Sequence, residues 1–341
     1  MKSLVRIGAT ALLVAATVAS FGQTQPRPTG IVTASNAATN TLLLYSTSNK
    51  LVQSIPTGGQ GGASGNSGGI AYSHNVLAVV NFGSKNVSIF DATPVGFRLV
   101  GLIPTQSSPL SVAFGHGHLY VLGTASIESH PIDNATVATA IDGWSPLVLG
   151  DGSAAQVGVL TAQLILTEKN NAIETVNLSP AGAVTGTTKL VANIPANVNA
   201  PFGLVTRQNE AYVTIAHANE ISLVRNDAVL TVTGSGTQSA PCWLTLDGAF
   251  LYSSNSPSKT VSRYVVYAQN IIQDAAVAAT FGGDPTDIDY RHGLLAVIDG
   301  TGSVSHLSIF NVDEDGNLSA PTVSNLPATA NGVVVVQEDN W

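Results

Sequence analysis

Three side chains in this sequence have the chemistry that general acid–base catalysis requires: His217, Glu168 and Asp299. An imidazole has an ordinary pKa of about 6.5, so His217 can give or take a proton near neutral pH. Either carboxylate can act as the base that activates a water molecule for attack on a carbonyl carbon. Amide side chains of Asn or Gln nearby can stabilise the negative oxygen that develops. These residue types therefore suit a hydrolytic reaction at a carbonyl group.

Five further residues are candidates for holding a substrate beside these three. They are Asn81, Lys169, Asn219, Asn255 and Trp144. The competing explanation for each candidate is an ordinary position in a solvated turn, because Asn, Asp and Gly are the residues that turns prefer. The sequence alone leaves both explanations open.

A divalent cation is a variant of the same site. Calcium takes roughly six to eight oxygen ligands, and Glu168, Asn197, Asn255 and Asp299 carry suitable oxygen atoms. These four residues come from separate parts of the chain, however. The main prediction therefore includes no cofactor and no metal, with a calcium ion in the channel as its variant.

Four short motifs resemble known sites, but each has a more ordinary explanation. Gly65–Gly69 fits the Gly-x-Ser-x-Gly pattern of a nucleophilic serine, yet that motif needs a strand before it and a helix after it. Asp313–Asn317 lacks the final glutamate of a calcium loop, so a turn built on Asp-Gly is predicted. His116 and His118 have no third metal ligand in view, and Cys242 is expected to be a buried core thiol.

The composition excludes several classes of protein. The 341 residues are 44% hydrophobic and 10% charged, which excludes a disordered chain and a coiled coil. The formal net charge is −8 and no cluster of Lys or Arg is present, so a nucleic-acid binder is excluded. A single cysteine rules out an intrachain disulfide and a cysteine zinc cage.

Residues 1–22 have the features of a secretory signal peptide. Two basic residues precede the apolar run Ile7–Val18, and small residues predict cleavage after Gly22. The run is too short for a membrane span, which needs about 20 residues. Residues 23–29 form a Pro-rich lead-in. We therefore expect a secreted or periplasmic protein that begins at Gln23, has its folded part in residues 30–341 and has no membrane association after cleavage.

An internal repeat is the strongest pattern in the chain. Leu77–Asp91, Ala211–Val224 and Leu295–Phe310 each combine a short β-branched strand, a polar turn and a second, alternating strand. Another strand precedes each segment. A fourth strand is expected at Phe97–Ile103, Val229–Thr233 and Ala276–Thr280.

Four strands per unit at a spacing of roughly 40–47 residues predict a β-propeller. Innermost strands are expected near Gly69, Leu110, Gln156, Phe202, Trp243, Thr286 and Gly332. The last of these has no strand after it, whereas Gly30–Ile55 supplies three strands at the N-terminus. We therefore predict an all-β, seven-bladed propeller with four antiparallel strands per blade, in which the C-terminal strand closes blade one. Two β-sandwiches, the alternative, would leave the regular spacing unexplained.

A propeller usually binds its ligand at one mouth of the central channel. The loops that lead into each innermost strand and those that join the second strand to the third lie there. The predicted order of strands places all eight candidate residues at this mouth. It places the following residues on the opposite face: His74, His116, His118, Arg207, Glu210, Asp247, Arg291 and His292.

Several segments resemble a known propeller family. Tyr212-Val-Thr-Ile and Leu77-Ala-Val-Val-Asn resemble the Tyr-Val-Thr-Asn surface-type repeat, and Pro56–Gly65 and Phe310–Ser319 are similar to segments of the lactonase propellers. That family includes the propeller-type 6-phosphogluconolactonase and the fungal 3-carboxymuconate lactonising enzyme. The resemblance covers most of residues 30–341 and implies the hydrolysis or formation of a lactone ring. The scarcity of Lys and Arg argues against a phosphorylated substrate.

Two functions follow from these patterns. The first is an exported lactone hydrolase or cycloisomerase that acts at the channel mouth on a small-molecule lactone or a sugar-like ligand. The second is a non-catalytic secreted scaffold that binds a protein or a glycan, and the small number of charged groups favours it. In either case we expect a monomer that binds no nucleic acid.

Overall fold

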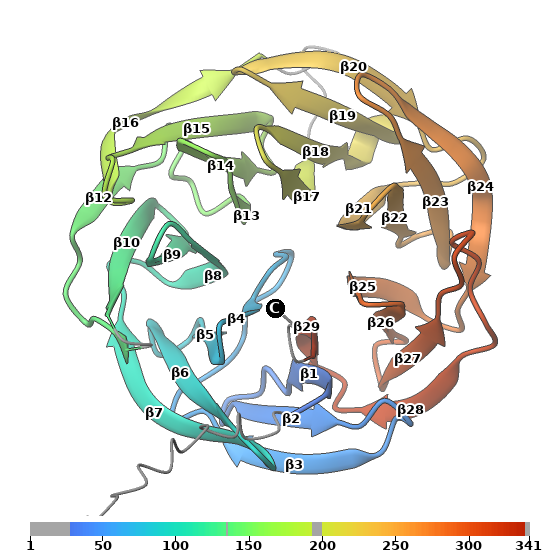
Figure 1. Ribbon diagram of the computed structural model, residues 1–341, viewed down its shortest axis with the longest axis horizontal. Helices are drawn as coiled ribbons and strands as arrows, with labels where there is room; N and C mark the ends of the chain where they lie inside the picture. The colour runs from blue at the N-terminus through green and yellow to red at the C-terminus, as the bar shows by residue number, and fades with distance from the viewer. Residues whose placement is uncertain (1–27, 134–135, 193–199, 338–341) are drawn as a thin grey trace, which may run out of the picture.

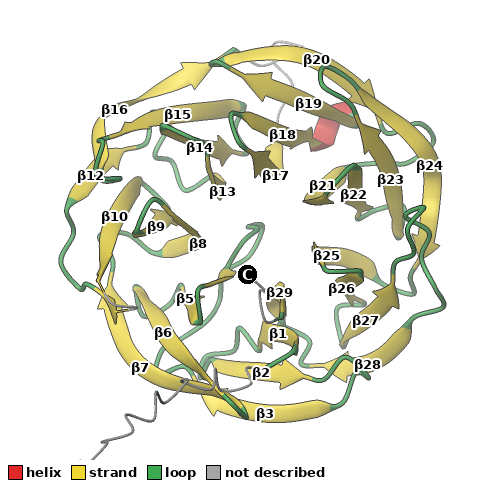
Figure 2. Cartoon of the chain, in the orientation of Figure 1, coloured by secondary structure: helices red, strands yellow, loops and turns green. Residues whose placement is uncertain are grey.

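The computed structural model describes residues 28–133, 136–192 and 200–337, which form a seven-bladed β-propeller (Figure 1). Seven antiparallel sheets stand around a central axis like the blades of a fan. Within the described ranges, the one helical element is the 3-10 turn η1 (Ala216–Ala218), drawn in red in Figure 2. The predicted fold class is confirmed. No helix in the described part of the chain has the length and apolarity needed to cross a membrane.

Within each blade, the first-named strand lies nearest the axis and the last-named strand lies at the rim. Blade one contains β29 (Asn331–Val336), β1 (Gly30–Ala34), β2 (Thr41–Tyr45) and β3 (Leu51–Pro56). Blade two contains β4 (Ile70–Ser73), β5 (Val76–Asn81), β6 (Asn86–Thr93) and β7 (Gly96–Pro104). Blade three contains β8 (Pro109–Gly115), β9 (His118–Gly123), β10 (Ser126–Asp133) and β12 (Gly143–Pro146), and the short β11 (Thr136–Val137) also pairs with β10.

The other four blades have the same order. Blade four contains β13 (Ala154–Val159), β14 (Gln163–Glu168), β15 (Ala172–Leu178) and β16 (Val184–Val191). Blade five contains β17 (Pro201–Arg207), β18 (Glu210–Ile215), β19 (Glu220–Arg225) and β20 (Ala228–Gly234). Blade six contains β21 (Pro241–Asp247), β22 (Phe250–Asn255), β23 (Thr260–Val266) and β24 (Ile271–Thr280). Blade seven contains β25 (Asp284–Arg291), β26 (Leu294–Gly300), β27 (Ser305–Asn311) and β28 (Thr322–Leu326).

The C-terminal strand closes the ring. β29 pairs antiparallel with β1, with Ile31 opposite Val335 and Val32 opposite Val334. This arrangement confirms the predicted closure of blade one and all seven predicted inner strands. One strand was assigned to the wrong blade: Ala276–Thr280 belongs to β24 of blade six, whereas β28 is the outer strand of the blade that contains Leu295–Phe310.

The core consists of layers between neighbouring blades. Side chains of a strand alternate between its two faces. The second strand of each blade, counted from the axis, therefore supplies side chains to the core layers on both sides of its blade. On β26, Leu295 and Val297 pack with the residues of blade six, whereas Ala296 and Ile298 pack with those of blade one. All four are buried. This two-sided burial explains why the second strands are almost continuously apolar.

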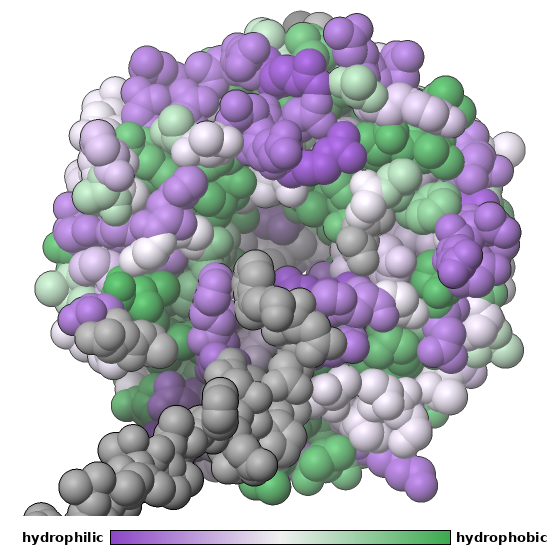
Figure 3. Space-filling view, viewed as in Figure 1, coloured by the Kyte–Doolittle hydropathy of each residue, from purple (hydrophilic) through white to green (hydrophobic). Residues whose placement is uncertain are grey.

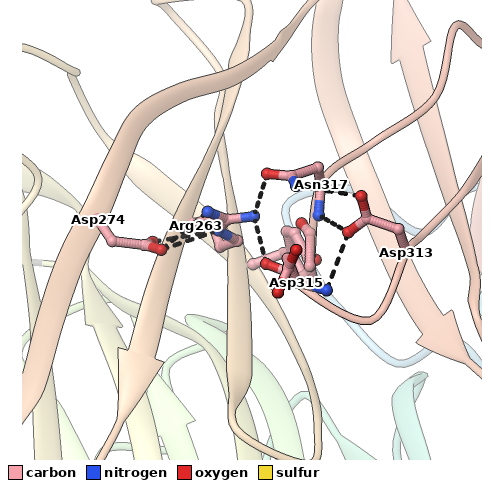
Figure 4. A network of polar contacts seen from close by, with 7 residues as sticks. Arg263, Asp274, Asp313, Asp315 and Asn317 are labelled. Atoms are coloured by element: carbon pink, nitrogen blue, oxygen red, sulfur yellow. Dashed lines mark hydrogen bonds and ion pairs between the residues drawn. The ribbon is translucent and has the colours of Figure 1, made fainter.

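Blades six and seven are also tied together at the rim of the disc (Figure 4). The guanidinium of Arg263 donates to both carboxylate oxygens of Asp274, and its Nη1 donates to the Asn317 side chain at 3.0 Å. The carboxylate of Asp313 accepts the backbone N–H groups of Asp315 and Asn317 at 3.0 and 2.7 Å. The predicted turn over Asp313–Asn317 is confirmed, and Arg263 holds it against blade six.

The two faces of the disc differ in their connections. We call the side that carries the turns between first and second strands, such as His74–Asn75, the hairpin face. The loop face is the opposite side, where the chain enters each inner strand and passes from the second strand to the third. The eight residues predicted to lie opposite the ligand mouth are indeed on or beside turns of the hairpin face.

Candidate functional site

The Gly-rich loop before β4 closes the channel at the loop face. Asn66 donates from its amide to the carbonyl oxygen of Leu110 in blade three, at 2.6 Å. Trp243 of blade six donates its indole N–H to the carbonyl oxygen of Asn66 at 3.0 Å, and Asn331 of blade one donates to the Asn66 side chain at 3.3 Å. The loop is therefore bonded to blades on opposite sides of the axis, and Figure 1 shows it reaching across the middle of the ring. We call Gly65–Gly69 the plug.

Two contacts with blade four complete the plug. The backbone N–H of Ser67 donates to the carbonyl oxygen of Ala155 at 3.1 Å. The ammonium group of Lys169 donates to the carbonyl oxygen of Gly65 at 2.6 Å. Gly68 has a φ of +65°, which favours glycine, and a Cβ there would come within 2.9 Å of the Ser111 hydroxyl. Glycine at this position thus lets the backbone enter the channel.

Glu168 ends β14 and is fully buried beside blade three. Its two carboxylate oxygens accept the backbone N–H groups of Leu149 and Gly150 at 3.1 and 3.2 Å. Glu174, its neighbour on β15, accepts the N–H of Val148. Burial and the adjacent Glu174 raise the pKa of Glu168 to about 8. The raised pKa favours the protonated form of this carboxyl group.

Asp299 and His217 lie in two other blades. Asp299, on β26 of blade seven, is 2% exposed and accepts the N–H of Gly283 at 2.9 Å and a contact from His306 Nδ1 at 3.3 Å. His217 lies in η1 of blade five and is exposed. No hydrogen bond or ion pair within the described ranges joins any two of His217, Glu168 and Asp299. Sequence reasoning missed His306, which faces Asp299 across the β26–β27 hairpin.

Asn81 and Asn255 have the same structural environment in two blades. Each is completely buried at the end of a second strand, and each donates to a serine hydroxyl seven residues later, Ser88 or Ser262, at 2.6 and 2.8 Å. Asn81 also accepts the hydroxyl of Thr57 in the loop after blade one, at 2.8 Å. These amides hold the second strand to the third.

The remaining predicted substrate residues are spread apart. Burial lowers the pKa of Lys169, whose ammonium group is engaged by the plug. Asn219 accepts the backbone N–H of Ala240 at 2.7 Å. Trp144, expected in a loop that enters the channel, lies instead on β12, the outer strand of blade three, and is 49% exposed. That expected position was wrong because Thr136–Val137 lengthens the path between β10 and β12.

Within the described residues, the channel runs from the plug toward the hairpin face. A cavity of about 360 Å³ extends from the plug between the inner strands, and Figure 3 shows the disc hollowed near its axis. This volume is within the range of small-molecule sites, roughly 300–1,000 Å³. Its polar lining includes Gln156, Thr245, Asp287, Asp289 and Arg291.

Two aspartates on β25 dominate the chemistry of this cavity. Asp287 and Asp289 are two positions apart, so their side chains share one face of the strand. They accept the backbone N–H groups of Val333 and Val335 on β29, at 3.1 and 2.7 Å. Burial raises the pKa of Asp287 to about 8, which favours its protonated form near neutral pH. Burial also raises the pKa of Asp289, and the charge of Arg291 opposes this shift.

These polar side chains serve a structural need of the inner strands. An inner strand has no sheet partner on its axial side, so its N–H groups must find other acceptors. Gln156 accepts the N–H of Leu204 in the next blade at 2.7 Å, and Thr245 accepts that of Tyr290 at 2.8 Å. Sequence reasoning missed these polar acceptors on the inner strands. The signal in the sequence was a polar residue inside an inner strand, such as Gln156 in β13 or Thr245 in β21.

The described residues contain no group of three or more His, Cys, Asp or Glu side chains placed to hold a metal ion. Asn197, one of the four calcium candidates, lies outside the described residues. The imidazoles of His116 and His118 are bound to different partners, because their Nε2 atoms contact the Leu160 carbonyl and Asp142, each at 2.8 Å.

Ser67 and Cys242, two further candidates for a nucleophile, both lie in surroundings that favour a structural role. Ser67 is buried within the plug at 4% exposure. The Cys242 thiol donates to the carbonyl oxygen of Ala240, and burial raises its pKa to about 12. A thiol with so high a pKa is not ionised at neutral pH and is a poor nucleophile.

No protein-family model matches this sequence, and no curated protein matches it either. Solved structures do match. A functionally unknown protein from Desulfotomaculum acetoxidans is 14% identical, with a TM-score of 0.68, over 91% of this chain and 99% of that one. A protein from Bacteroides uniformis, named provisionally as a 6-phosphogluconolactonase, is 15% identical with a TM-score of 0.66, over 92% and 100%.

A third structure, virginiamycin B lyase from Staphylococcus aureus, is 14% identical with a TM-score of 0.56, over 81% of this chain and 92% of that one. Identities this low establish the fold alone. The resemblance to lactonase-type propellers is confirmed at that level.

Proposed function

We propose that the protein binds a small, uncharged polar ligand of lactone or sugar-like chemistry in its central channel, entered from the hairpin face. One observation carries the proposal: Gly65–Gly69 spans the channel at the loop face, and a cavity of about 360 Å³ extends from it between the inner strands of the described residues. A pocket with one entrance and convergent polar groups is a common form of small-molecule site.

The lining favours an uncharged ligand. The raised pKa of Asp287 favours its protonated form, which can donate a hydrogen bond, and Gln156 offers an amide. Apolar walls at Val112 and Leu204 suit the carbon skeleton of such a molecule. A phosphate or a carboxylate would meet the negative charge of Asp289 whenever that group is ionised. Binding alone, without chemistry, would share only the lack of catalysis with the scaffold predicted from the sequence, which binds a protein or a glycan.

Hydrolysis of a lactone is the second candidate, favoured by the two aspartates. Asp289 in its ionised form would take a proton from water as the water oxygen bonds to the lactone carbonyl carbon. Asp287 in its protonated form would give its proton to the ring oxygen as the ring C–O bond breaks. The rival location for the same reaction is the loop face, with His217, Glu168 and Asp299 as acid–base groups.

Calorimetry with γ-butyrolactone, glucono-δ-lactone, glucose and gluconate tests the binding proposal, and the same mixtures are assayed for ring opening. We expect one of the neutral ligands to bind wild-type protein and the His217→Ala variant equally. Asp289→Asn, in the channel wall, should weaken this binding at least tenfold. Turnover lost in Asp289→Asn would favour the channel as the reaction site, whereas turnover lost only in His217→Ala would favour the loop face. Absence of binding by every neutral ligand, with a folded protein by circular dichroism, would overturn the proposal.

Export is proposed on the sequence alone, because residues 1–22 lie outside the described residues. Expression of the full chain in a bacterial host tests it. Protein recovered from the periplasm or the medium should begin at Gln23, and retention of intact Met1 in the cytoplasm would contradict export.

A further inference from the structure

A second cavity, of about 300 Å³, opens beside the channel on the hairpin face, between blades two and three. Its lining is mainly apolar, with imidazole rings at the rim. The lining residues that matter are Val76, Phe114, Ile132, His74, His116 and His118. The proposed function does not use this cavity.

The cavity exists because the core between blades two and three is incompletely filled at this end. Phe114 and Ile132 are only partly buried and pack at the edge of the core layer that contains Val76. The turn beyond Phe114 contains Gly115 and Gly117, and a Cβ at Gly117 would meet nothing within 4 Å. No side chain therefore fills the space at Gly117, whereas a Cβ at Gly115 would instead come within 2.7 Å of Val159 in blade four.

The two cavities meet at the channel entrance. Ser73 and Phe114 line both of them. Phe114 therefore presents its ring as a shared wall, and Ser73 lies at the rim, where its hydroxyl contacts His74 Nδ1 at 2.7 Å. A ligand seated in the channel can extend over this rim into the second cavity without entering the closed core.

The polar atoms of the second cavity are largely engaged within the protein. His118 uses Nδ1 on the carbonyl oxygen of His116, at 2.9 Å, and Nε2 on Asp142, at 2.8 Å. His116 uses Nε2 on the Leu160 carbonyl oxygen. What remains for a ligand is mainly the faces of the rings and the apolar side chains. Such a surface favours an aliphatic or aromatic group over a charged one.

We propose that the ligand of this protein has two parts, a neutral polar head that binds in the channel and an apolar tail that lies in the cavity between blades two and three. This inference rests on the proposed function, because it extends the same site. The ligand class is a lactone or a similar neutral polar ring that carries an aliphatic or aromatic substituent.

A series of γ-lactones with unbranched alkyl substituents from methyl to octyl tests the inference, with γ-butyrolactone as the parent. Each methylene that enters the apolar cavity should strengthen binding about three- to fourfold. The gain should stop once the cavity is filled. Affinity measured by calorimetry that does not change with chain length would overturn the inference, while binding of the parent would keep the proposed function.

Variants locate the tail. Ile132→Trp fills the second cavity and should remove the dependence on chain length, leaving the affinity for γ-butyrolactone within about twofold of wild type. Ile272→Trp, on the outer strand β24 where the side chain is 51% exposed, is the matched control and should keep the full dependence. If Ile132→Trp fails to fold, Ile132→Phe makes the same test with less added volume.

The remaining outcomes separate the two proposals. A chain-length dependence that persists fully in both Ile132 variants would overturn the assignment of the tail to this cavity. Failure of the parent, of all its alkyl derivatives and of the sugars to bind would overturn the proposed function itself and the inference with it.

Discussion

The ammonium group of Lys169 lies 2.6 Å from the carbonyl oxygen of Gly65, a residue 104 positions earlier in the chain. Through this contact blade four holds the loop that precedes blade two across the end of the channel. Lys169 also lies over the ring of Phe202, 5.8 Å from its centroid. A lysine predicted to bind substrate thus acts, in this structure, on the protein's own backbone.

Replacing Lys169 with Met should loosen the plug. The substitution keeps much of the apolar stem but removes the charged donor to Gly65, so the free energy of unfolding should fall by about 1.5–3 kcal/mol. Urea denaturation measures this loss. Hydrogen exchange at the Ser67 amide should become faster than in wild type. An unchanged exchange rate at Ser67 would mean that Lys169 does not hold the plug.

The stability of the protein should fall as pH rises from about 4 to about 8, and Asp287 should account for part of this fall. Its folded-state pKa of about 8 is above the ordinary value, so the unfolded chain loses the proton first. Below both pKa values the group has no effect on stability, and above both it destabilises the fold fully. Asp287→Asn should therefore show a smaller loss of stability between pH 4 and pH 8 in urea titrations. Parallel pH profiles for the two proteins would contradict this explanation.

Glu168→Gln separates a structural role from a catalytic one. The folded-state pKa of Glu168, about 8, is also raised, so the substitution should reduce the loss of stability between about pH 4.5 and pH 8. Ligand affinity in the channel should stay within about twofold of wild type, because the side chain is buried beside blade three. Calorimetry measures the ligand affinity of the variant. A large loss of affinity would place the ligand at the loop face instead of the channel.

Arg263→Met should break the tie between blades six and seven. Arg263 is only 13% exposed and bonds both Asp274 and the Asp313–Asn317 turn, so about 1.5–3 kcal/mol of stability should be lost. Arg98→Met is the matched control. Arg98 is 70% exposed and contacts Asp91 alone, so its loss should be below about 1 kcal/mol. Equal urea midpoints for the two variants would show that the contacts of Arg263 between blades six and seven stabilise the fold no more than an exposed ion pair does.

The fold was predictable because its signals are local and periodic. Alternating β-branched strands and polar turns recur at a regular spacing, and each second strand is apolar on both faces because it supplies two core layers. The unpaired strand near Gly332 required a partner, and the N-terminal strands from Gly30 supplied one. Both arguments use only strand pairings that the sequence pattern itself implies.

The location of the site depended on contacts that no local pattern encodes. Gly65–Gly69 looks like a flexible turn in the sequence, but its role comes from bonds between Asn66 and residues 177 and 265 positions away, Trp243 and Asn331. Alternation indicates that Asp287 and Asp289 share a face, yet only the packing of β25 beside β29 makes that face the channel wall. Strand period and closure are thus properties of the sequence itself. Which mouth the plug spans is decided by long-range contacts that form only after the blades have assembled into a ring.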